Sequence, residues 1–173
     1  MKRLLSGCLV GALLLGTSCL DVSGGAVEVS WVIRDTRQRG AGCDSNGLQI
    51  VGTPIARVRL QVQLVAPDGT VGEDLCAAGV VAGCEWDCKN KGGTTPFDIP
   101  VPNADPQASG DADYREYVFS LVPLSGDGTP IDSSIVQVPP PVRRYVRKGD
   151  LVDLGLWMMV VPAEEDVDDI IGN

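Results

Sequence analysis

The sequence predicts an all-β fold, an antiparallel β-sandwich stapled by disulfide bonds. Three observations predict it. Apolar and polar residues alternate in several short segments, Gly, Pro and Asp separate those segments, and an even number of cysteines follows an export leader. No segment keeps the 3.6-residue period of an amphipathic helix over several turns. Aromatic residues make up only 5% of the chain, so we expect an aliphatic core.

The clearest predicted strand covers residues 56–64, where a strict period of two runs through the whole segment. Alternation of this length gives a strand one buried face and one solvated face. The turn at 67–70 (PDGT) follows, since Pro presets φ and Gly accepts a positive φ. The expected inward residues are Ala56, Val58, Leu60, Val62 and Leu64, between the outward residues Arg57, Arg59, Gln61 and Gln63.

Three more segments are predicted strands: 27–33, 114–124 and 151–161. Their expected inward residues include Val27, Val29, Trp31 and Ile33 in the first and Tyr117, Phe119 and Leu121 in the second.

The segments between these strands are predicted loops, most of them rich in Pro, Gly and Asp. The run at 139–141 (PPP) is a stiff connector that cannot lie inside a sheet. Residues 84–98 are expected to form a cysteine-pinned loop or an edge hairpin. For residues 70–83 the sequence allows either a short helix or a loop.

The first nineteen residues have the parts of a secretory signal. Lys2 and Arg3 precede an apolar run at 4–15, and the small residues of 16–18 lead to Cys19. The run is too short to span a bilayer, which takes about 20 apolar residues. We therefore expect residues 1–18 to be removed on export.

The segment 15–19 (LGTSC) resembles the lipobox of bacterial lipoproteins. That resemblance implies that Cys19 is diacylated and becomes the mature N-terminus, so the predicted address is the bacterial cell envelope. Leu20 is not the Asp that retains such proteins in the inner membrane, which implies the outer membrane. The alternative is an ordinary signal peptide and a secreted protein.

The predicted domain order after the signal peptide is a lipidated tether at 19–26, a β-sandwich at 27–162 and an acidic tail at 163–173. In architecture alone, the sandwich resembles the immunoglobulin-like or prealbumin-like modules of secreted proteins.

Four cysteines remain once Cys8 leaves with the leader and Cys19 is acylated: Cys43, Cys76, Cys84 and Cys88. Behind an export signal they predict two disulfides, with three connectivities open. The alternative is a zinc site of four thiolates, which needs two pairs of cysteines that are close in sequence. Only Cys84 and Cys88 are close, and the expected compartment is oxidising, so we favour the disulfides. We expect Cys43 to bond to Cys84 or Cys88, and Cys76 to take the other.

Charge and composition exclude several classes of function. The net charge is −9, and −11 without the leader, which argues against a nucleic-acid partner. The chain has no histidine, so it lacks the usual general base and every Ser-His or Cys-His pair. No dinucleotide loop, P-loop or nucleophile elbow is present, and we predict neither a cofactor nor an enzyme.

Three groups of residues are candidate sites. Trp86, in the cysteine-rich loop, could be an exposed ligand-binding aromatic or could cover a sheet edge. The basic run at 143–148 could contact lipid head groups, or it could be a solvated strand with Val142 and Val146 inward. Oxygen ligands for calcium could come from Asp105, Asp111, Asp113 and Glu116, although the pattern is weak and a solvated loop is the favoured explanation.

These features predict a non-catalytic interaction or structural module of the cell envelope. Its expected partners are the membrane, through the N-terminal lipid, and an envelope protein or glycan. The alternative is a surface domain that binds carbohydrate or calcium.

Overall fold

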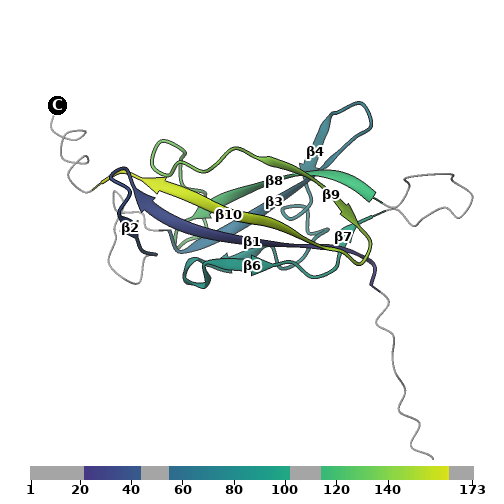
Figure 1. Cartoon of the computed structure of the whole chain (residues 1–173), viewed down its shortest axis with the longest axis horizontal. Helices are drawn as coiled ribbons and strands as arrows, with labels where there is room; N and C mark the ends of the chain where they lie inside the picture. Colours follow the sequence, from purple (N-terminus) through teal and green to yellow (C-terminus); the bar gives the residue numbers. More distant parts are fainter. Residues whose placement is uncertain (1–21, 44–54, 102–113, 164–173) are drawn as a thin grey trace, which may run out of the picture.

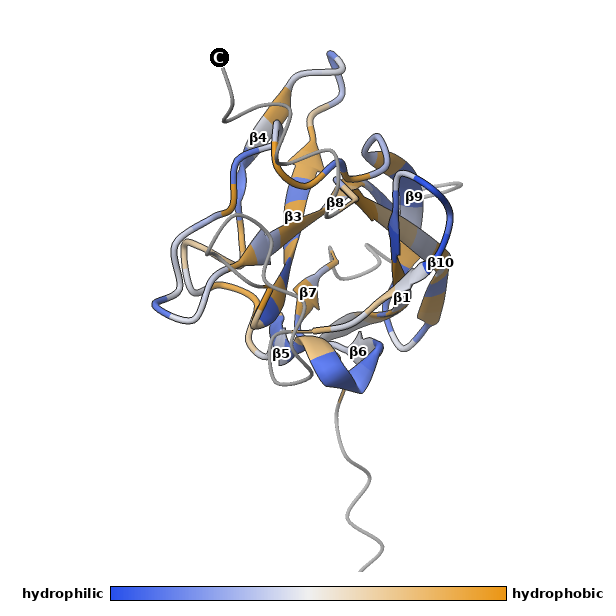
Figure 2. Ribbon diagram, turned by 90° about the vertical axis from the view of Figure 1, so that its left-hand side faces the viewer, coloured by the Kyte–Doolittle hydropathy of each residue, from blue (hydrophilic) through white to orange (hydrophobic). Residues whose placement is uncertain are grey.

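The computed structural model describes residues 22–43, 55–101 and 114–163, which form two five-stranded β-sheets packed face to face (Figures 1 and 2). The fold is therefore all-β, a β-sandwich with two disulfides, as predicted. One sheet contains β1 (Gly24–Asp35), β2 (Gly40–Ala41), β6 (Gly92–Thr94), β7 (Ile99–Pro100) and β10 (Leu151–Val161). The other contains β3 (Arg57–Val65), β4 (Val71–Asp74), β5 (Glu85–Asp87), β8 (Tyr114–Leu124) and β9 (Val142–Arg147).

The two sheets differ in strand direction. The second has the order β4-β3-β8-β9, with β5 also on β3, and all its pairs are antiparallel. In the first sheet β2, β6 and β7 pair antiparallel with β1, but β10 pairs with β1 in parallel. The sandwich is thus antiparallel except where its first and last long strands lie side by side (Figure 1).

The predicted alternation of side chains forms the core. Val58, Leu60 and Val62 of β3 are fully buried and form one core cluster with apolar residues of β8, the neighbouring strand, and of β1 in the other sheet. Leu64 was expected inside, but it is exposed and Val65 is buried in its place. The alternation of β3 thus ends at this point, where its pairing with β4 also becomes irregular between Gln63 and Val65.

The sheets are connected on both sides of the core (Figure 2). On one side β9 leads through the turn at 148–150 to β10, which belongs to the other sheet. On the other side β5 pairs with β3, and the 3-10 turn η2 (Cys88–Asn90) leads to β6, which pairs with β1. Residues 84–98 therefore form a crossover between sheets and not an edge hairpin.

The predicted tether is shorter than expected, because β1 begins at Gly24 and not at Val27. Gly24 and Gly25 fall within the predicted tether, but both are buried in the strand. A Cβ on Gly24 would lie 2.2 Å from the Ile99 carbonyl oxygen, and one on Gly25 would lie 2.2 Å from Val146 Cγ1. These glycines permit close packing of strands rather than flexibility.

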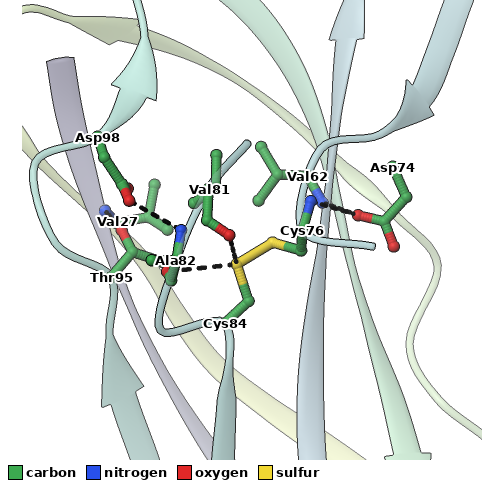
Figure 3. Close-up of a disulfide and its surroundings, with 9 residues drawn as sticks. All are labelled: Val27, Val62, Asp74, Cys76, Val81, Ala82, Cys84, Thr95 and Asp98. Carbon is green, nitrogen blue, oxygen red and sulfur yellow. Dashed lines mark hydrogen bonds between the residues drawn. A yellow bond between two sulfur atoms is a disulfide. The ribbon is translucent and has the colours of Figure 1, made fainter. Parts of the chain in front are cut away.

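The segment 70–83 forms β4 and a series of turns, without a helix. Asp74, the last residue of β4, fixes the point where the turns begin, because its Oδ1 accepts hydrogen bonds from the backbone N–H groups of Val62 (3.2 Å) and Cys76 (3.0 Å). The Cys76–Cys84 disulfide then closes the loop (Figure 3). Within this loop, the Ala82 N–H donates to Asp98 Oδ2 (2.8 Å), so the loop is tied to the segment that precedes β7.

Charge is distributed unevenly between the folded body and the rest of the chain. The described residues contain 12 basic and 13 acidic side chains, a formal net charge of −1. The other residues hold the remaining 2 basic and 10 acidic side chains of the totals, 14 and 23, and so account for −8 of the −9. The folded sandwich is thus nearly neutral, so the arrangement of its charged side chains says more about a binding site than the net charge of the chain does.

None of the described residues forms a helix long and apolar enough to cross a membrane.

Candidate functional site

A cavity of about 440 Å³ lies beside the carboxyl-terminal half of β1, next to the disulfide between Cys43 and Cys88. Its volume is within the range of small-molecule sites. We call it the Cys43–Cys88 pocket. Its lining residues come from β1, from the β2 segment and from η2 with the residue after it: Trp31, Val32, Ile33, Arg34, Gly40, Ala41, Gly42, Cys43, Cys88, Lys89 and Lys91.

The disulfide brings two distant segments to the same place. The Cα atoms of Cys43 and Cys88 lie 5.7 Å apart although 45 positions separate them. Trp31 fixes the second segment to β1, because its Nε1–H donates to the Cys88 carbonyl (3.1 Å) and its backbone N–H to the Lys91 carbonyl (2.9 Å). Asp87 caps η2 by accepting the Lys89 N–H (2.9 Å). The pocket wall is therefore held by covalent and hydrogen-bonded contacts.

The turn between β1 and β2 is held by one carboxylate. Asp35 Oδ1 accepts the backbone N–H groups of Arg37 (3.0 Å) and Arg39 (2.8 Å), and Oδ2 pairs with Arg39 Nε at 2.6 Å. Burial would raise the pKa of Asp35, but the hydrogen bonds and charge of Arg39, with the Arg37 N–H, lower it below the usual 3.8. The ionised carboxylate thus stabilises the turn that presents Gly40 to the pocket.

Replacing Asp35 by Asn should destabilise the protein in a pH-dependent way. Because the pKa of Asp35 is lowered in the folded state, its contribution is present above the unfolded pKa of 3.8 and is lost as pH falls through the folded pKa. The difference in Tm between wild type and Asp35→Asn should be largest near neutral pH and should shrink below pH 3.8. Thermal melts from pH 2 to 7 measure it, with Glu28→Gln on the same strand as the control. A constant difference for Asp35→Asn would contradict this role.

The pocket is basic. Three of its lining residues are cationic, Arg34, Lys89 and Lys91, and none is acidic. The two carboxylates nearest to these cations in sequence already have other partners. Asp35 pairs with Arg39 and the backbone, and Asp87 accepts a hydrogen bond from the backbone of η2. No ion pair between described residues involves the three cations. The Arg34 guanidinium donates to the Gln38 carbonyl (2.7 Å), which holds that side chain in place.

Trp86, for which the sequence left open an exposed binding role or the cover of a sheet edge, is partly buried against the core. Its ring lies over Gly93, where a Cβ would come within 2.1 Å of the ring, and its centroid is 6.2 Å from that of Trp31. Trp86 therefore packs across the crossover between the sheets, which matches the alternative that it covers a sheet edge. It is not among the residues that line the pocket.

The calcium hypothesis receives no support from the described residues. Asp105, Asp111 and Asp113 lie outside them, and Glu116 faces Arg143 at 3.7 Å. No group of three or more His, Cys, Asp or Glu side chains within residues 22–43, 55–101 and 114–163 is arranged to hold a metal. Cys19, the predicted lipidation site, also lies outside the described residues.

The basic run at 143–148 lies on β9 and the turn after it. Val146 is buried and Val142 packs partly against the core, as predicted, while Arg143, Arg144 and Arg147 are exposed. Tyr145 is 60% exposed and meets Tyr114 edge to face at 4.9 Å, and Arg147 lies over the Tyr114 ring at 5.7 Å. This surface is at the opposite end of β1 from the pocket, near β7 in Figure 1.

The sequence-based reasoning missed the three pocket cations. None of Arg34, Lys89 and Lys91 was among the predicted site residues. The available signal was the expected bond from Cys43 to Cys84 or Cys88, because such a bond brings the segment before Cys43 close to the lysines near Cys88. No known protein family, no curated protein and no solved structure matches the chain.

Proposed function

We propose that this chain is an exported, lipid-anchored and non-catalytic module of the bacterial cell envelope. The observation that carries this proposal is the state of the cysteines. All four that follow Cys19 are joined in two disulfides, the chemistry of oxidising compartments, behind a leader that ends in Cys19. Two acyl chains on Cys19 would hold the domain stably on a membrane. We propose the outer membrane because Leu20 follows the cysteine.

The start of β1 supports an orientation relative to that membrane. Gly24 is only five positions after Cys19, a reach of roughly 17 Å when fully extended. The Gly24 carbonyl accepts the Gly149 N–H (2.9 Å), so the β9–β10 turn stands beside the point where the tether enters. Arg147 and Lys148 would then lie close to the lipid head groups, where each basic side chain contributes about 1 kcal/mol on an anionic surface.

The same orientation would turn the Cys43–Cys88 pocket away from the membrane. β1 contains twelve residues and begins at the tether. At about 3.3 Å per residue its far end would be roughly 36 Å from its start, and the pocket residues of β1 occupy positions 31–34. The module would therefore present the pocket to the compartment that it faces.

A second candidate function is ligand binding at the cell surface, which the pocket favours. The sequence suggested carbohydrate or calcium as the ligand. Among the described residues that line the pocket there are three cations and no carboxylate, which suits an anion or an uncharged molecule and not a calcium ion. A carbohydrate therefore fits this pocket better than calcium does.

Replacement of Cys19 by Ser tests the anchor. The wild-type protein should incorporate an alkyne-tagged fatty acid and sediment with membranes, whereas Cys19→Ser should do neither, because Ser offers no thiol for acylation. Click labelling and membrane fractionation in the bacterial host measure both. The matched control is Cys8→Ser, which should label like wild type. If Cys19→Ser still labels, the anchor is at another residue and the proposal fails.

A further inference from the structure

We propose that the Cys43–Cys88 pocket binds a small organic anion, a molecule with one carboxylate or phosphate group attached to an apolar or ring portion. The inference deepens the second candidate function by naming the ligand class, and it does not depend on the lipid anchor. It rests on the charge, the shape and the fixed walls of the pocket.

The charge of the pocket selects an anion. Arg34, Lys89 and Lys91 line the pocket, and no acidic residue is among the described residues that line it, in a folded body whose basic and acidic groups are otherwise nearly balanced. Arg34 lies on β1, and the two lysines lie on η2 and directly after it, so the cations approach from two walls. Charge-assisted hydrogen bonds from such groups to carboxylate or phosphate are about twice as strong as neutral ones.

The rest of the pocket suits an apolar body. Val32 and Ala41 are partly exposed in its wall, and the buried Ile33 and Trp31 lie behind them. The cavity of about 440 Å³ is at the small end of the range for ligand sites, which reaches about 1,000 Å³. A single ring with one anionic substituent therefore fits better than a polymer such as an extended glycan chain.

The walls are fixed before any ligand arrives. The disulfide joins the segment before Cys43 to η2, and Asp35 holds the turn that leads to Gly40. Lys91 has φ of 56°, and its backbone N–H bonds to the Cys88 carbonyl at 3.2 Å, so the chain around the second lysine is constrained too. A preformed site loses less conformational entropy on binding than a mobile one.

Equilibrium dialysis of the mature protein, purified in a nonionic detergent, tests the proposal with radiolabelled benzoate as the probe. We expect saturable binding at one site that weakens as NaCl rises. Phenyl phosphate, inorganic phosphate and glucuronate compete in separate arms, which distinguish carboxylate, phosphate and acidic-sugar ligands. Benzamide, the uncharged analogue, should compete at least tenfold more weakly. Absence of saturable binding for every anion up to 50 mM would overturn the proposal.

Paired variants locate the site. Lys89→Gln with Lys91→Asn removes two charges, and Asn tolerates the positive φ at position 91. This double variant should raise the Kd for benzoate at least tenfold with an unchanged Tm. Arg143→Gln with Arg147→Gln removes two charges at the other end and should leave the Kd unchanged. Equal weakening in both double variants would mean nonspecific electrostatic attraction and would contradict the proposed site. Failure here leaves the Cys19 experiment, and so the anchor proposal, unaffected.

Discussion

Replacing Trp31 by Ala should lower the free energy of unfolding by about 3–5 kcal/mol, the range for truncating a buried Trp or Phe. Trp31 is only 1% exposed and lies in the middle of β1, the central strand of its sheet. Its indole fills the space between β1 and the crossover, packs near Trp86 and donates to the Cys88 carbonyl. Truncation would leave a cavity and also an unpaired carbonyl, and each of these is destabilising.

Urea denaturation followed by far-UV circular dichroism measures this loss. Trp31→Phe keeps most of the apolar volume and should cost less than Trp31→Ala, although it loses the same hydrogen bond. Tyr145→Ala is the surface control, since Tyr145 is 60% exposed and most surface substitutions change stability by less than about 0.5 kcal/mol. A loss under about 1 kcal/mol for Trp31→Ala would contradict its placement in the core.

Removal of the two disulfides should have unequal effects. The Cys43–Cys88 bond closes a loop of 45 residues and the Cys76–Cys84 bond one of 8. The chain-entropy model gives about 4 kcal/mol for the first and about 2.5 kcal/mol for the second, because a longer loop restricts the unfolded chain more. The double variant Cys43→Ser/Cys88→Ser should therefore unfold at a lower denaturant concentration than Cys76→Ser/Cys84→Ser.

Denaturant midpoints of the two double variants, measured under oxidising conditions, give this order directly. Wild type in excess reductant should resemble a variant that lacks both bonds. An inverted order, with the short loop contributing more, would mean that native contacts around Cys76 outweigh the loop entropy. That result would contradict the ranking from loop length.

Much of the fold could be predicted from local patterns. The strands at 114–124 and 151–161 have the predicted bounds, because alternation and flanking turn residues act within a few positions. The parallel direction of β10 beside β1 could not be predicted, since alternation is the same for either direction and the paired residues are more than a hundred positions apart. Leu64 was misplaced because the hydropathy pattern continues to the end of β3, whereas the alternation of buried and exposed residues ends there, beside an irregular pairing with β4.

The candidate site was less accessible to prediction than the fold. The disulfide partners agree with the expected bond from Cys43 to the 84–88 end, because few cysteines remain to choose from. The pocket depends on how three separate segments meet, which no local pattern encodes. The sequence left the position of Trp86 open, because charged residues flank it; in the fold, Gly93 of β6 leaves room for its ring.

The most direct test of the lipid-anchored module is the intact mass of the mature protein purified from bacterial membranes. The proposal predicts a chain that begins at Cys19, carries a diacylglyceryl group on that residue and has two disulfides. Tandem mass spectrometry of the N-terminal peptide should place the lipid on Cys19. A mature chain without lipid, whether it begins at Cys19 or elsewhere, would contradict the anchor and favour a secreted protein.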